Sequence, residues 1–391
     1  MEIKMKKKIK LMNKIAKVGT EVFEEELFTL GDVDGQYDAI IVRSASLHET
    51  PFPESLSAIA RAGAGVNNVP VEQCTERGIV VFNTPGANAN GVKELALCAL
   101  VLAARDVVGG IKWAETLCGE SGVAKTVEAG KSVYVGNELL GKKLGVIGLG
   151  AIGGMVANAA NALGMTVLGY DPYITPAAAW SLAPAIKQAS GYDEIFKSCD
   201  YITLHVPSTP TTKNMISEKS IAMMKKGVRI INLARADLVS AADIKAALES
   251  GKVAKYVTDF PTEDTVGVRG IINIPHLGAS TYESEDHCAI MASKQLREYL
   301  LTGNIKNSVN FPSVTLPHTA RARVTVMHKN IPNMLSQITS AFSREGVNIE
   351  NLANGSKGDV AYTIVETDDA CDVNIVNAVM AIDGVFAVRT Y

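Results

Sequence analysis

The stretch Lys143-Leu144-Gly145-Val146-Ile147-Gly148-Leu149-Gly150-Ala151-Ile152-Gly153 decides the fold of this chain. An apolar strand leads into three glycines, and a helix of small residues begins at Ala151 and Ile152. In this spacing Gly148 permits a tight turn, Gly150 lets the backbone approach a pyrophosphate, and Gly153 lets the helix pack closely on the strand. The free N–H groups and partial positive charge at the start of the helix favour the same anion.

An aspartate, Asp171, ends the next predicted strand, 18 residues after the third glycine. Its carboxylate can accept both ribose hydroxyls of an adenosine, and its charge would repel a 2′-phosphate. Strand, helix, second strand and acid therefore fall in the register of a dinucleotide-binding unit, which is far more specific than the glycine spacing alone. We predict a Rossmann-type, doubly wound parallel sheet that binds NAD rather than NADP.

Length and composition limit the class of protein. With 391 residues the chain is too long for one hydrophobic core, and 47% hydrophobic with 20% charged residues is an ordinary globular balance. The formal net charge of −3 gives no reason to expect nucleic acid as a partner. No apolar run is long enough to cross a bilayer, and the six cysteines lack metal-ligand spacing. We expect a cytoplasmic protein with no metal site and no membrane contact.

The order of predicted elements places the NAD unit inside another domain. Strand patterns alternate with helical ones, as is typical of parallel α/β sheets. The strands are expected at 39–43, 79–82, 201–206, 229–232 and 255–259, and the helices at 51–60, 91–107 and 282–301. If the last helix rejoins the first segment, a flavodoxin-like α/β substrate domain (1–90 and 283–310) encloses the NAD domain (91–282).

The last part of the chain has the pattern of a separate small domain. After a proline-containing linker at 311–319, residues 320–391 show the order strand, helix, strand, strand, helix, strand. The two helices are expected at 334–345 and 372–382. This βαββαβ order predicts a ferredoxin-like fold.

Three charged or titratable residues follow strands of the NAD unit, at the edge where open parallel sheets bind ligands: Arg235, Glu263 and His276. Oxidation of an alcohol by NAD needs a base for the hydroxyl proton, and histidine titrates near neutral pH. A carboxylate beside it would stabilise the imidazolium, and a guanidinium can hold two oxygens of a substrate carboxylate. Each residue alone could be an ordinary loop residue, and His205 could be structural or could line the cofactor site. Their joint placement behind one NAD motif favours a catalytic set.

These motifs together resemble the D-2-hydroxyacid dehydrogenase family. The resemblance rests on the glycine run and on the segments 232–235, 259–263 and 275–280, supported by 42–44, 61–68 and 83–86. Within that family they match the branch that oxidises 3-phospho-D-glycerate (3-phosphoglycerate) to 3-phosphohydroxypyruvate, the first step of L-serine biosynthesis. One departure is that family members commonly have glycine after the catalytic arginine, whereas Ala236 and Asp237 follow Arg235 here.

The resemblance implies a role for each matching residue. His276 would be the acid and base, Glu263 its partner, and Arg235 the clamp on the substrate carboxylate. The residues expected to bind the cofactor are Gly148, Gly150, Ala151, Ile152, Gly153, Asp171, His205, Pro207, Ala234 and Asp259. Those expected to bind the substrate are Arg43, Ser44, Arg61, Gly63, Ala64, Gly65 and Lys93.

Two alternative functions stay open. Arg43 and Arg61 match phosphate-binding positions of the family, and a dehydrogenase for an unphosphorylated acid such as glycerate or lactate would not need both cations. The alternative from another class is a non-catalytic NAD-sensing regulator.

The C-terminal module resembles the ACT domains that bind amino acids in biosynthetic enzymes. The matching segments are 327–335 and 346–349. In serine-inhibited relatives, the positions that match His328, Asn330 and Asn348 hold the effector across a pair of domains. We therefore expect feedback inhibition by L-serine in a homodimer or homotetramer. A module that serves only oligomerisation is the alternative.

Overall fold

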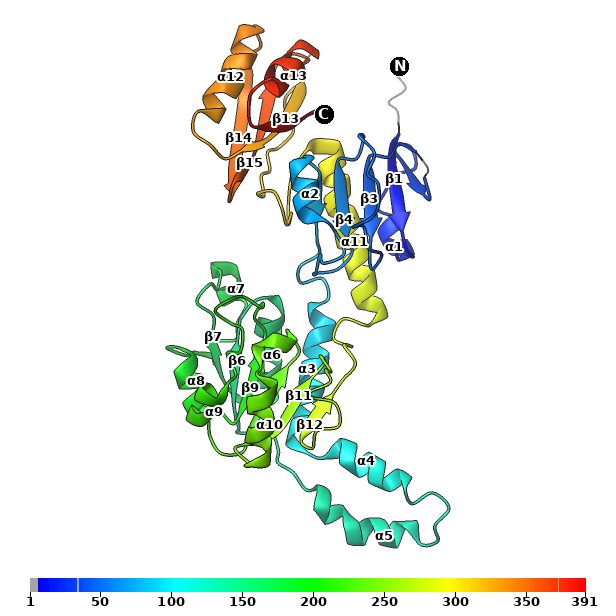
Figure 1. Cartoon of the computed structure of the whole chain (residues 1–391), viewed down its shortest axis with the longest axis vertical. Coiled ribbons are helices and arrows are strands. Elements are labelled where there is room, and N and C mark those ends of the chain that lie inside the picture. The colour runs from blue at the N-terminus through cyan, green and yellow to red at the C-terminus, as the bar shows by residue number, and fades with distance from the viewer. Residues whose placement is uncertain (1–5, 34, 372) are drawn as a thin grey trace. The chain divides into compact units, whose positions relative to one another are not determined.

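The computed structural model describes residues 6–33, 35–371 and 373–391 of the chain. Contacts divide it into two compact units, one formed by Met1–Asn88 with Glu285–Tyr391 and the other by Ala89–Ser284 (Figure 1). The predicted fold class, parallel α/β sheets followed by an antiparallel sheet, is confirmed. The finer division of the first unit into a substrate domain, a linker and a regulatory module stays a prediction.

The second unit is built on a parallel sheet of seven strands in the order β12-β11-β10-β9-β6-β7-β8. The strands are β6 (Lys143–Ile147), β7 (Thr166–Tyr170), β8 (Lys187–Gln188), β9 (Tyr201–Leu204), β10 (Val228–Asn232), β11 (Val253–Thr258) and β12 (Ile271–Asn273). The strand order reverses between β6 and β9. Open α/β sheets bind ligands at such a switch point, so the glycine loop after β6 lies where a dinucleotide site is expected.

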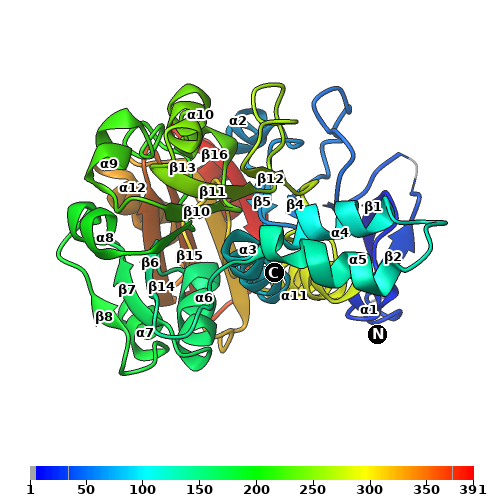
Figure 2. The same ribbon diagram turned by 90° about the horizontal axis from the view of Figure 1, so that it is seen from below.

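Helices cover both faces of this sheet (Figure 2). On one face α3 (Ala89–Ala104) and α6 (Ala151–Ala162) contribute buried side chains that include Leu100 and Val156. The other face is covered by α8 (Tyr192–Ser198), α9 (Glu218–Met223) and α10 (Ala241–Glu249), and the short α7 (Pro176–Trp180) follows β7. Helix α3 packs against both α6 and the sheet, which explains why it is apolar on most of its faces.

A helical arm (107–140) follows α3. It consists of α4 (Val107–Glu115), α5 (Val123–Gly130), a 3₁₀ turn at Lys131–Tyr134 and the residues up to Leu140. The rings of Trp113 and Tyr134 stack with their centroids 5.4 Å apart. None of the residues in the two helices and the 3₁₀ turn is buried.

The first unit begins with a parallel sheet in the order β2-β1-β3-β4-β5, which is the flavodoxin-like order. Its strands are β1 (Lys7–Met12), β2 (Phe28–Gly31), β3 (Ala39–Val42), β4 (Ala58–Arg61) and β5 (Val80–Phe82), and its short helices are α1 (Lys17–Thr20) and α2 (Val71–Glu76). Strand β4 corrects the expectation of a helix at 51–60. Alanines and an isoleucine suit a helix equally well, but Ala58, Ile59 and Ala60 are fully buried between two neighbouring strands, so tertiary packing decides.

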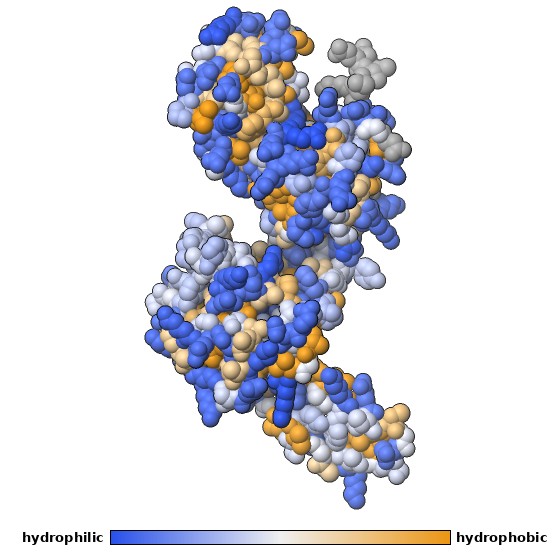
Figure 3. Space-filling model, in the orientation of Figure 1, coloured by the Kyte–Doolittle hydropathy of each residue, from blue (hydrophilic) through white to orange (hydrophobic). Residues whose placement is uncertain are grey.

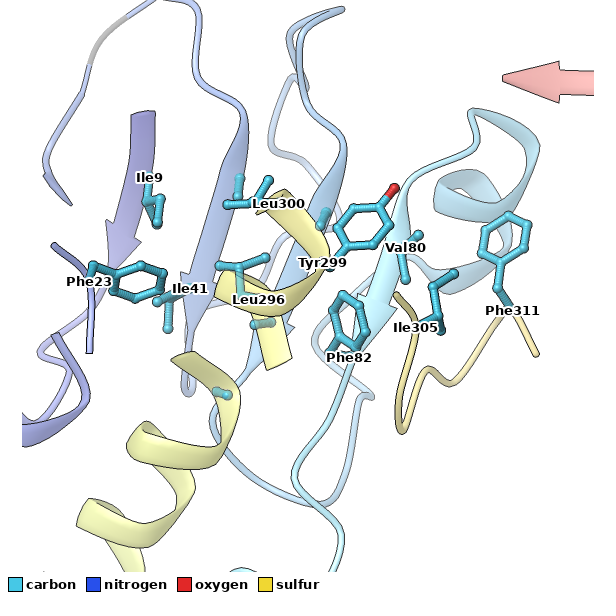
Figure 4. Close-up of a cluster of buried hydrophobic side chains, with 14 of the residues drawn as sticks. Ile9, Phe23, Ile41, Val80, Phe82, Leu296, Tyr299, Leu300, Ile305 and Phe311 are labelled. Carbon is cyan, nitrogen blue, oxygen red and sulfur yellow. The ribbon is translucent and has the colours of Figure 1, made fainter. Parts of the chain in front are cut away.

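The long helix α11 (Tyr282–Thr302) covers one face of this sheet (Figure 4). Leu296, Tyr299 and Leu300 pack against sheet residues that include Ile41 and Phe82, and all five are buried. The start and the end of α11 agree with the predicted helix within one residue. Because this helix belongs mostly to the first unit, the chain returns to that unit after the NAD sheet is complete.

The C-terminal part of the first unit folds as a four-stranded antiparallel sheet in the order β14-β15-β13-β16. Its elements are β13 (Ala322–Lys329), α12 (Met334–Arg344), β14 (Ile349–Lys357), β15 (Val360–Thr367), α13 (Val373–Met380) and β16 (Val385–Thr390). This confirms the ferredoxin-like order. Asp372, where the second helix is predicted to begin, lies outside the described residues.

Both faces of this antiparallel sheet are covered. Ile338 of α12 and Ile375 of α13 are buried against one face. On the opposite face the Tyr362 hydroxyl donates to the Gly303 carbonyl at 2.6 Å, and Ile364 joins the core that contains the end of α11. The module is therefore packed on the rest of the first unit rather than held by the linker alone. No helix in the described part of the chain is both long and apolar enough to cross a membrane.

Candidate active site

The glycine loop after β6 has the geometry that its sequence predicts. Gly148 has φ +89°, and a Cβ there would lie 2.5 Å from the His205 carbonyl oxygen. A Cβ on Gly153 would lie 1.9 Å from the Gly148 carbonyl oxygen, so this position accepts only glycine. A Cβ on Gly150 would have no other atom within 4 Å, which leaves open space above the start of α6. That space is where a pyrophosphate could approach the backbone.

Asp171 directly follows β7 and is fixed by the backbone around it. Its Oδ2 accepts from the Leu149 N–H and its Oδ1 from the Tyr173 N–H, both at 2.9 Å. The first bond ties the carboxylate to the glycine loop. The negative charge is thereby held beside the position expected for the adenosine ribose.

His205 follows β9, and its backbone carbonyl lies against the glycine loop. Its backbone N–H donates to the Ile147 carbonyl at 2.8 Å, and its Nε2 lies 2.9 Å from the Thr203 Oγ1. Burial lowers the pKa of the imidazole to about 4. The ring is therefore neutral at neutral pH, which favours a structural or cofactor-lining role over proton transfer.

Asp259 has an unsatisfied acceptor that a nicotinamide would suit. The residue is 1% exposed, the Gly278 N–H bonds to its carboxylate, and its Oδ1 has no partner among the described residues. Burial raises the pKa of this carboxyl, opposed by the nearby charge of His276. A buried acceptor without a donor is costly, and the amide group of a nicotinamide is a donor of the required kind.

Arg235 lies in a loop whose conformation is fixed by hydrogen bonds of Asn232 and Asp237. The fully buried Asn232 donates from its Nδ2 to the Arg235 carbonyl at 2.8 Å and accepts from the Ala234 N–H at 3.2 Å. Asp237, at the position that departs from the family pattern, accepts from the Ser208 hydroxyl at 2.5 Å. This bond joins the arginine loop to the loop that starts at Pro207, whose carbonyl accepts from Thr212. Arg235 itself is exposed, and its Nη1 donates to the Ala234 carbonyl at 2.6 Å.

His276 occupies a strained backbone position. Its φ is +38°, and its N–H donates to the carbonyl oxygens of Asp259 and Ile274 at 3.1 and 3.0 Å. The exposed ring stacks at a tilt on Phe260, with the centroids 4.8 Å apart. Non-glycine residues rarely adopt positive φ, and such strain is concentrated at functional sites.

Glu263 is not joined to His276 in this structure. The glutamate is exposed in the loop after β11, and no ion pair or hydrogen bond between the two side chains occurs among the described residues. Its role as the partner of the histidine stays a prediction.

The first unit gathers the predicted phosphate-binding residues at the carboxyl edge of its sheet. Arg43 follows β3 and Arg61 ends β4, and the Arg61 Nε donates to the Arg43 carbonyl at 3.0 Å. The Arg61 guanidinium lies over Gly63, where a Cβ would be 1.7 Å from the Arg61 Nη1. Burial lowers the pKa of Arg61; the Cys288 thiol opposes this shift, and the charge of Arg43 adds to it.

Hydrogen bonds of asparagine side chains fix the loops at this edge of the first sheet. Asn13 accepts from the Ser44 N–H at 3.2 Å, and Asn83 donates to the Ala64 carbonyl at 2.7 Å. Gly65 follows in the same loop. Ser44, Ala64 and Gly65 therefore lie at the same sheet edge as the two arginines.

Sequence reasoning missed Glu285. This residue in the first turn of α11 pairs with Arg43, with the Nη2 and Oε1 2.5 Å apart. The two residues are 242 positions apart in the chain, so no local pattern could reveal the contact. Lys93 lies on α3 in the second unit, where its ammonium donates to the Asn90 side chain at 2.7 Å.

The three predicted effector residues do not meet within one module. His328 is 2% exposed, and its ring nitrogens contact the Lys329 carbonyl and the Thr363 hydroxyl, each at 2.9 Å. Asn330 bonds to the Gly358 carbonyl at one end of β14, and Asn348 precedes the other end of that strand. A shared site would therefore need two modules. The described residues include no group of three His, Cys, Asp or Glu side chains that could hold a metal.

Comparisons with known proteins identify the family. The NAD binding domain of the D-isomer specific 2-hydroxyacid dehydrogenases matches residues 112–278. The D-3-phosphoglycerate dehydrogenase of Methanocaldococcus jannaschii is 34% identical over 317 residues, covering 78% of this chain and 58% of the relative. The enzyme of the same name from Rattus norvegicus is 33% identical over 377 residues, covering 91% of this chain and 67% of the relative. The chain belongs to the D-isomer specific 2-hydroxyacid dehydrogenases.

Solved structures of related enzymes share the architecture of this chain. A glyoxylate reductase from Paecilomyes thermophila is 27% identical with a TM-score of 0.63, covering 78% of this chain and 98% of that chain. The NAD⁺-bound 3-phosphoglycerate dehydrogenase from Entamoeba histolytica is 26% identical with a TM-score of 0.59, covering 78% and 99%. The predicted NAD-binding domain of an oxidoreductase family is thus confirmed, whereas the roles of single residues stay predictions. The chain spans little more than half the length of the curated relative from Methanocaldococcus jannaschii.

Proposed function

We propose that this protein oxidises 3-phosphoglycerate at C2 with NAD and forms 3-phosphohydroxypyruvate, the entry step of L-serine biosynthesis. The observation that carries the proposal is the pair of guanidinium groups, Arg43 and Arg61, fixed at the ligand-binding edge of the first sheet. A phosphate is the ligand that two adjacent arginines suit best. The names of the relatives support the same substrate.

The second unit supplies the residues for the chemical step. His276 takes the proton from the C2 hydroxyl, because its imidazole is exposed and imidazole is the side chain that most often serves as a general base. Arg235 grips the substrate carboxylate with two N–H groups, and Asp259 accepts from the nicotinamide carboxamide through its free oxygen. When bound, NAD supplies the hydride acceptor.

A dehydrogenase for another 2-hydroxy acid is the second candidate, since the glyoxylate reductase above has the same architecture. The test is NADH formation with 3-phosphoglycerate and with glycerate under identical conditions. Preference for 3-phosphoglycerate by kcat/KM supports the proposal, and preference for glycerate refutes it. Absence of turnover with every 2-hydroxy acid, together with NAD binding, would instead point to a regulator.

We also propose that L-serine inhibits the enzyme through paired C-terminal modules. The polar groups of Asn330 and Asn348 lie at opposite ends of one strand, so a second module would have to bring them together. L-serine should lower the rate of NADH formation, and Asn348→Ala should remove that inhibition without changing the uninhibited rate. Inhibition that survives in Asn348→Ala would refute this site.

We further propose a homodimer in the cytoplasm. The helical arm (107–140) carries apolar side chains at its surface, visible as orange patches at the lower end of Figure 3. The exposures are 54% for Ile111, 79% for Val133 and 78% for Val135, which favours cover by a second copy. Light scattering should give the mass of a dimer, and Val133→Glu with Val135→Glu should give a monomer.

The cytoplasmic location rests on the cysteines. All six are free, which suits a reducing compartment.

A further inference from the structure

The guanidinium of Arg43 is already engaged by a carboxylate of the same unit. Arg43 lies where the order of the first sheet reverses, between β1 and β3. Glu285 reaches it from the first turn of α11, at 2.5 Å between Nη2 and Oε1. The side chains are 42% and 37% exposed, so water and a ligand can reach both.

Three charges therefore share this sheet edge. Arg61 is fixed by its bond to the Arg43 carbonyl and by Gly63 beneath it, so its charge cannot move away. The lowered pKa of Arg61 reflects burial and the repulsion from Arg43, opposed by the Cys288 thiol. Two cations and the carboxylate of Glu285 leave a net charge of one at the site. A phosphate group carries nearly two negative charges at neutral pH.

We propose that Glu285 is a specificity-determining residue that competes with the substrate phosphate for Arg43. This inference rests on the proposed function, because the phosphate is that of 3-phosphoglycerate. The competition follows from geometry: the Arg43 Nη2 donates to the Glu285 Oε1 at 2.5 Å, so a phosphate oxygen that approaches this nitrogen has to displace the carboxylate or lie beside its negative charge. Glu285 thus weakens binding of the phosphorylated acid relative to an unphosphorylated one.

The carboxylate cannot escape the site when the phosphate arrives. Helix α11 is anchored by Leu296, Tyr299 and Leu300 in the core of the first unit, so Glu285 can turn its side chain but cannot withdraw its backbone. Its negative charge stays close to the bound phosphate. The repulsion that remains is electrostatic and depends on ionic strength.

The decisive variant is Glu285→Gln, which keeps the size of the side chain and an acceptor for Arg43 but removes the charge. We expect KM for 3-phosphoglycerate to fall by about threefold to tenfold. KM for glycerate and the affinity for NADH should stay unchanged, because neither carries the phosphate that meets Arg43. The gain should shrink when salt is added.

Two controls make the result specific. Glu283→Gln removes the same charge from an exposed position two residues earlier in α11, and should leave KM for 3-phosphoglycerate as in the wild type. Glu285→Asp keeps the charge and should also stay close to the wild type. Thermal unfolding of each variant shows that the fold is intact.

An unchanged or raised KM in Glu285→Gln overturns the inference, because Glu285 would then be neutral or would orient Arg43 for the substrate. A fall of equal size in Glu283→Gln overturns it as well, since the effect would be one of general charge. Turnover of 3-phosphoglycerate by the wild-type enzyme tests the proposed function by itself. The ratio of KM values between variant and wild type tests only the role of Glu285.

Discussion

Arg323 and Glu366 form an ion pair from which water is excluded: the Arg323 Nη2 and the Glu366 Oε1 lie 2.6 Å apart, and neither side chain has exposed surface. They face each other in register on the neighbouring strands β13 and β15. Arg323 also donates to the carbonyl oxygens of Thr302 and Leu316, at 2.6 and 2.8 Å. The pair therefore fastens the C-terminal sheet to the end of α11 and to the segment that follows it.

Replacing Glu366 by glutamine should destabilise the protein strongly. Burial raises the pKa of Glu366, but its bonds with Arg323 and the charge of that residue lower it by more, so the carboxyl is ionised at neutral pH. Glu366→Gln leaves the buried charge of Arg323 without compensation. We expect the free energy of unfolding to fall by about 3–5 kcal/mol, measured by urea denaturation followed by circular dichroism.

The chain offers a matched control for this change. Arg321 and Asp369 also form an ion pair of the C-terminal module, but their side chains are 69% and 73% exposed. Asp369→Asn should cost only about 0–1 kcal/mol. Similar losses in the two variants would show that burial of the Arg323 pair is not what stabilises this joint.

Two glycines of the NAD loop should respond differently to alanine. At Gly153 a Cβ would meet the Gly148 carbonyl oxygen at 1.9 Å, so Gly153→Ala must displace α6 from β6. We expect a loss of about 2 kcal/mol or more in the free energy of unfolding and loss of NADH binding. At Gly150 the same methyl group meets open space, so Gly150→Ala should keep the stability and weaken only NADH binding.

Both glycine variants are measured by thermal unfolding and by quenching of protein fluorescence with NADH. Tight NADH binding in Gly150→Ala would mean that the pyrophosphate does not approach this glycine. Wild-type stability in Gly153→Ala would mean that the close packing of helix on strand is not required.

The sequence was sufficient for features that depend on local spacing. The turn at Gly148, the start of α6 and the position of Asp171 all follow from a run of fewer than thirty residues, because each residue's task is set by its neighbours in the chain. The ends of α11 were predictable for the same reason, since its apolar positions recur with the helical period.

Features that depend on contacts between distant segments were not predictable. Strand β4 contains Ala58, Ile59 and Ala60, which suit a helix until two flanking strands enclose them. Glu285 reaches Arg43 across 242 positions of the chain, and the fastening of β13 by Arg323 depends on the end of α11. Such pairs follow from topology, which a single sequence does not specify residue by residue.

His205 should make stability depend on pH. Its pKa is about 4 in the folded protein, against an ordinary value of 6.5, because the imidazole is buried. Between these values the unfolded chain binds a proton that the folded chain does not. The contribution of His205 to stability is therefore fully present above pH 6.5 and is lost as the pH drops towards 4, by on the order of 3 kcal/mol.

The measurement is the free energy of unfolding at several pH values within that interval. His205→Gln should reduce the slope, because a glutamine at this position has no proton to gain. His287→Gln, which replaces an exposed histidine of α11 in the same way, is the control and should keep the slope. A slope that is identical in His205→Gln and in the wild type would contradict the prediction.

His276→Ala should separate catalysis from cofactor binding. The ring is exposed and rests on Phe260, whereas the backbone of His276 makes the contacts with Asp259 and Ile274 that shape the loop. Removal of the imidazole thus deletes the proposed proton acceptor and leaves the loop in place. We expect kcat with 3-phosphoglycerate to fall by about 10²–10⁴-fold, while the dissociation constant of NADH changes by less than about twofold. His287→Ala serves as the control with wild-type kcat, and substantial turnover in His276→Ala would assign proton transfer to another group.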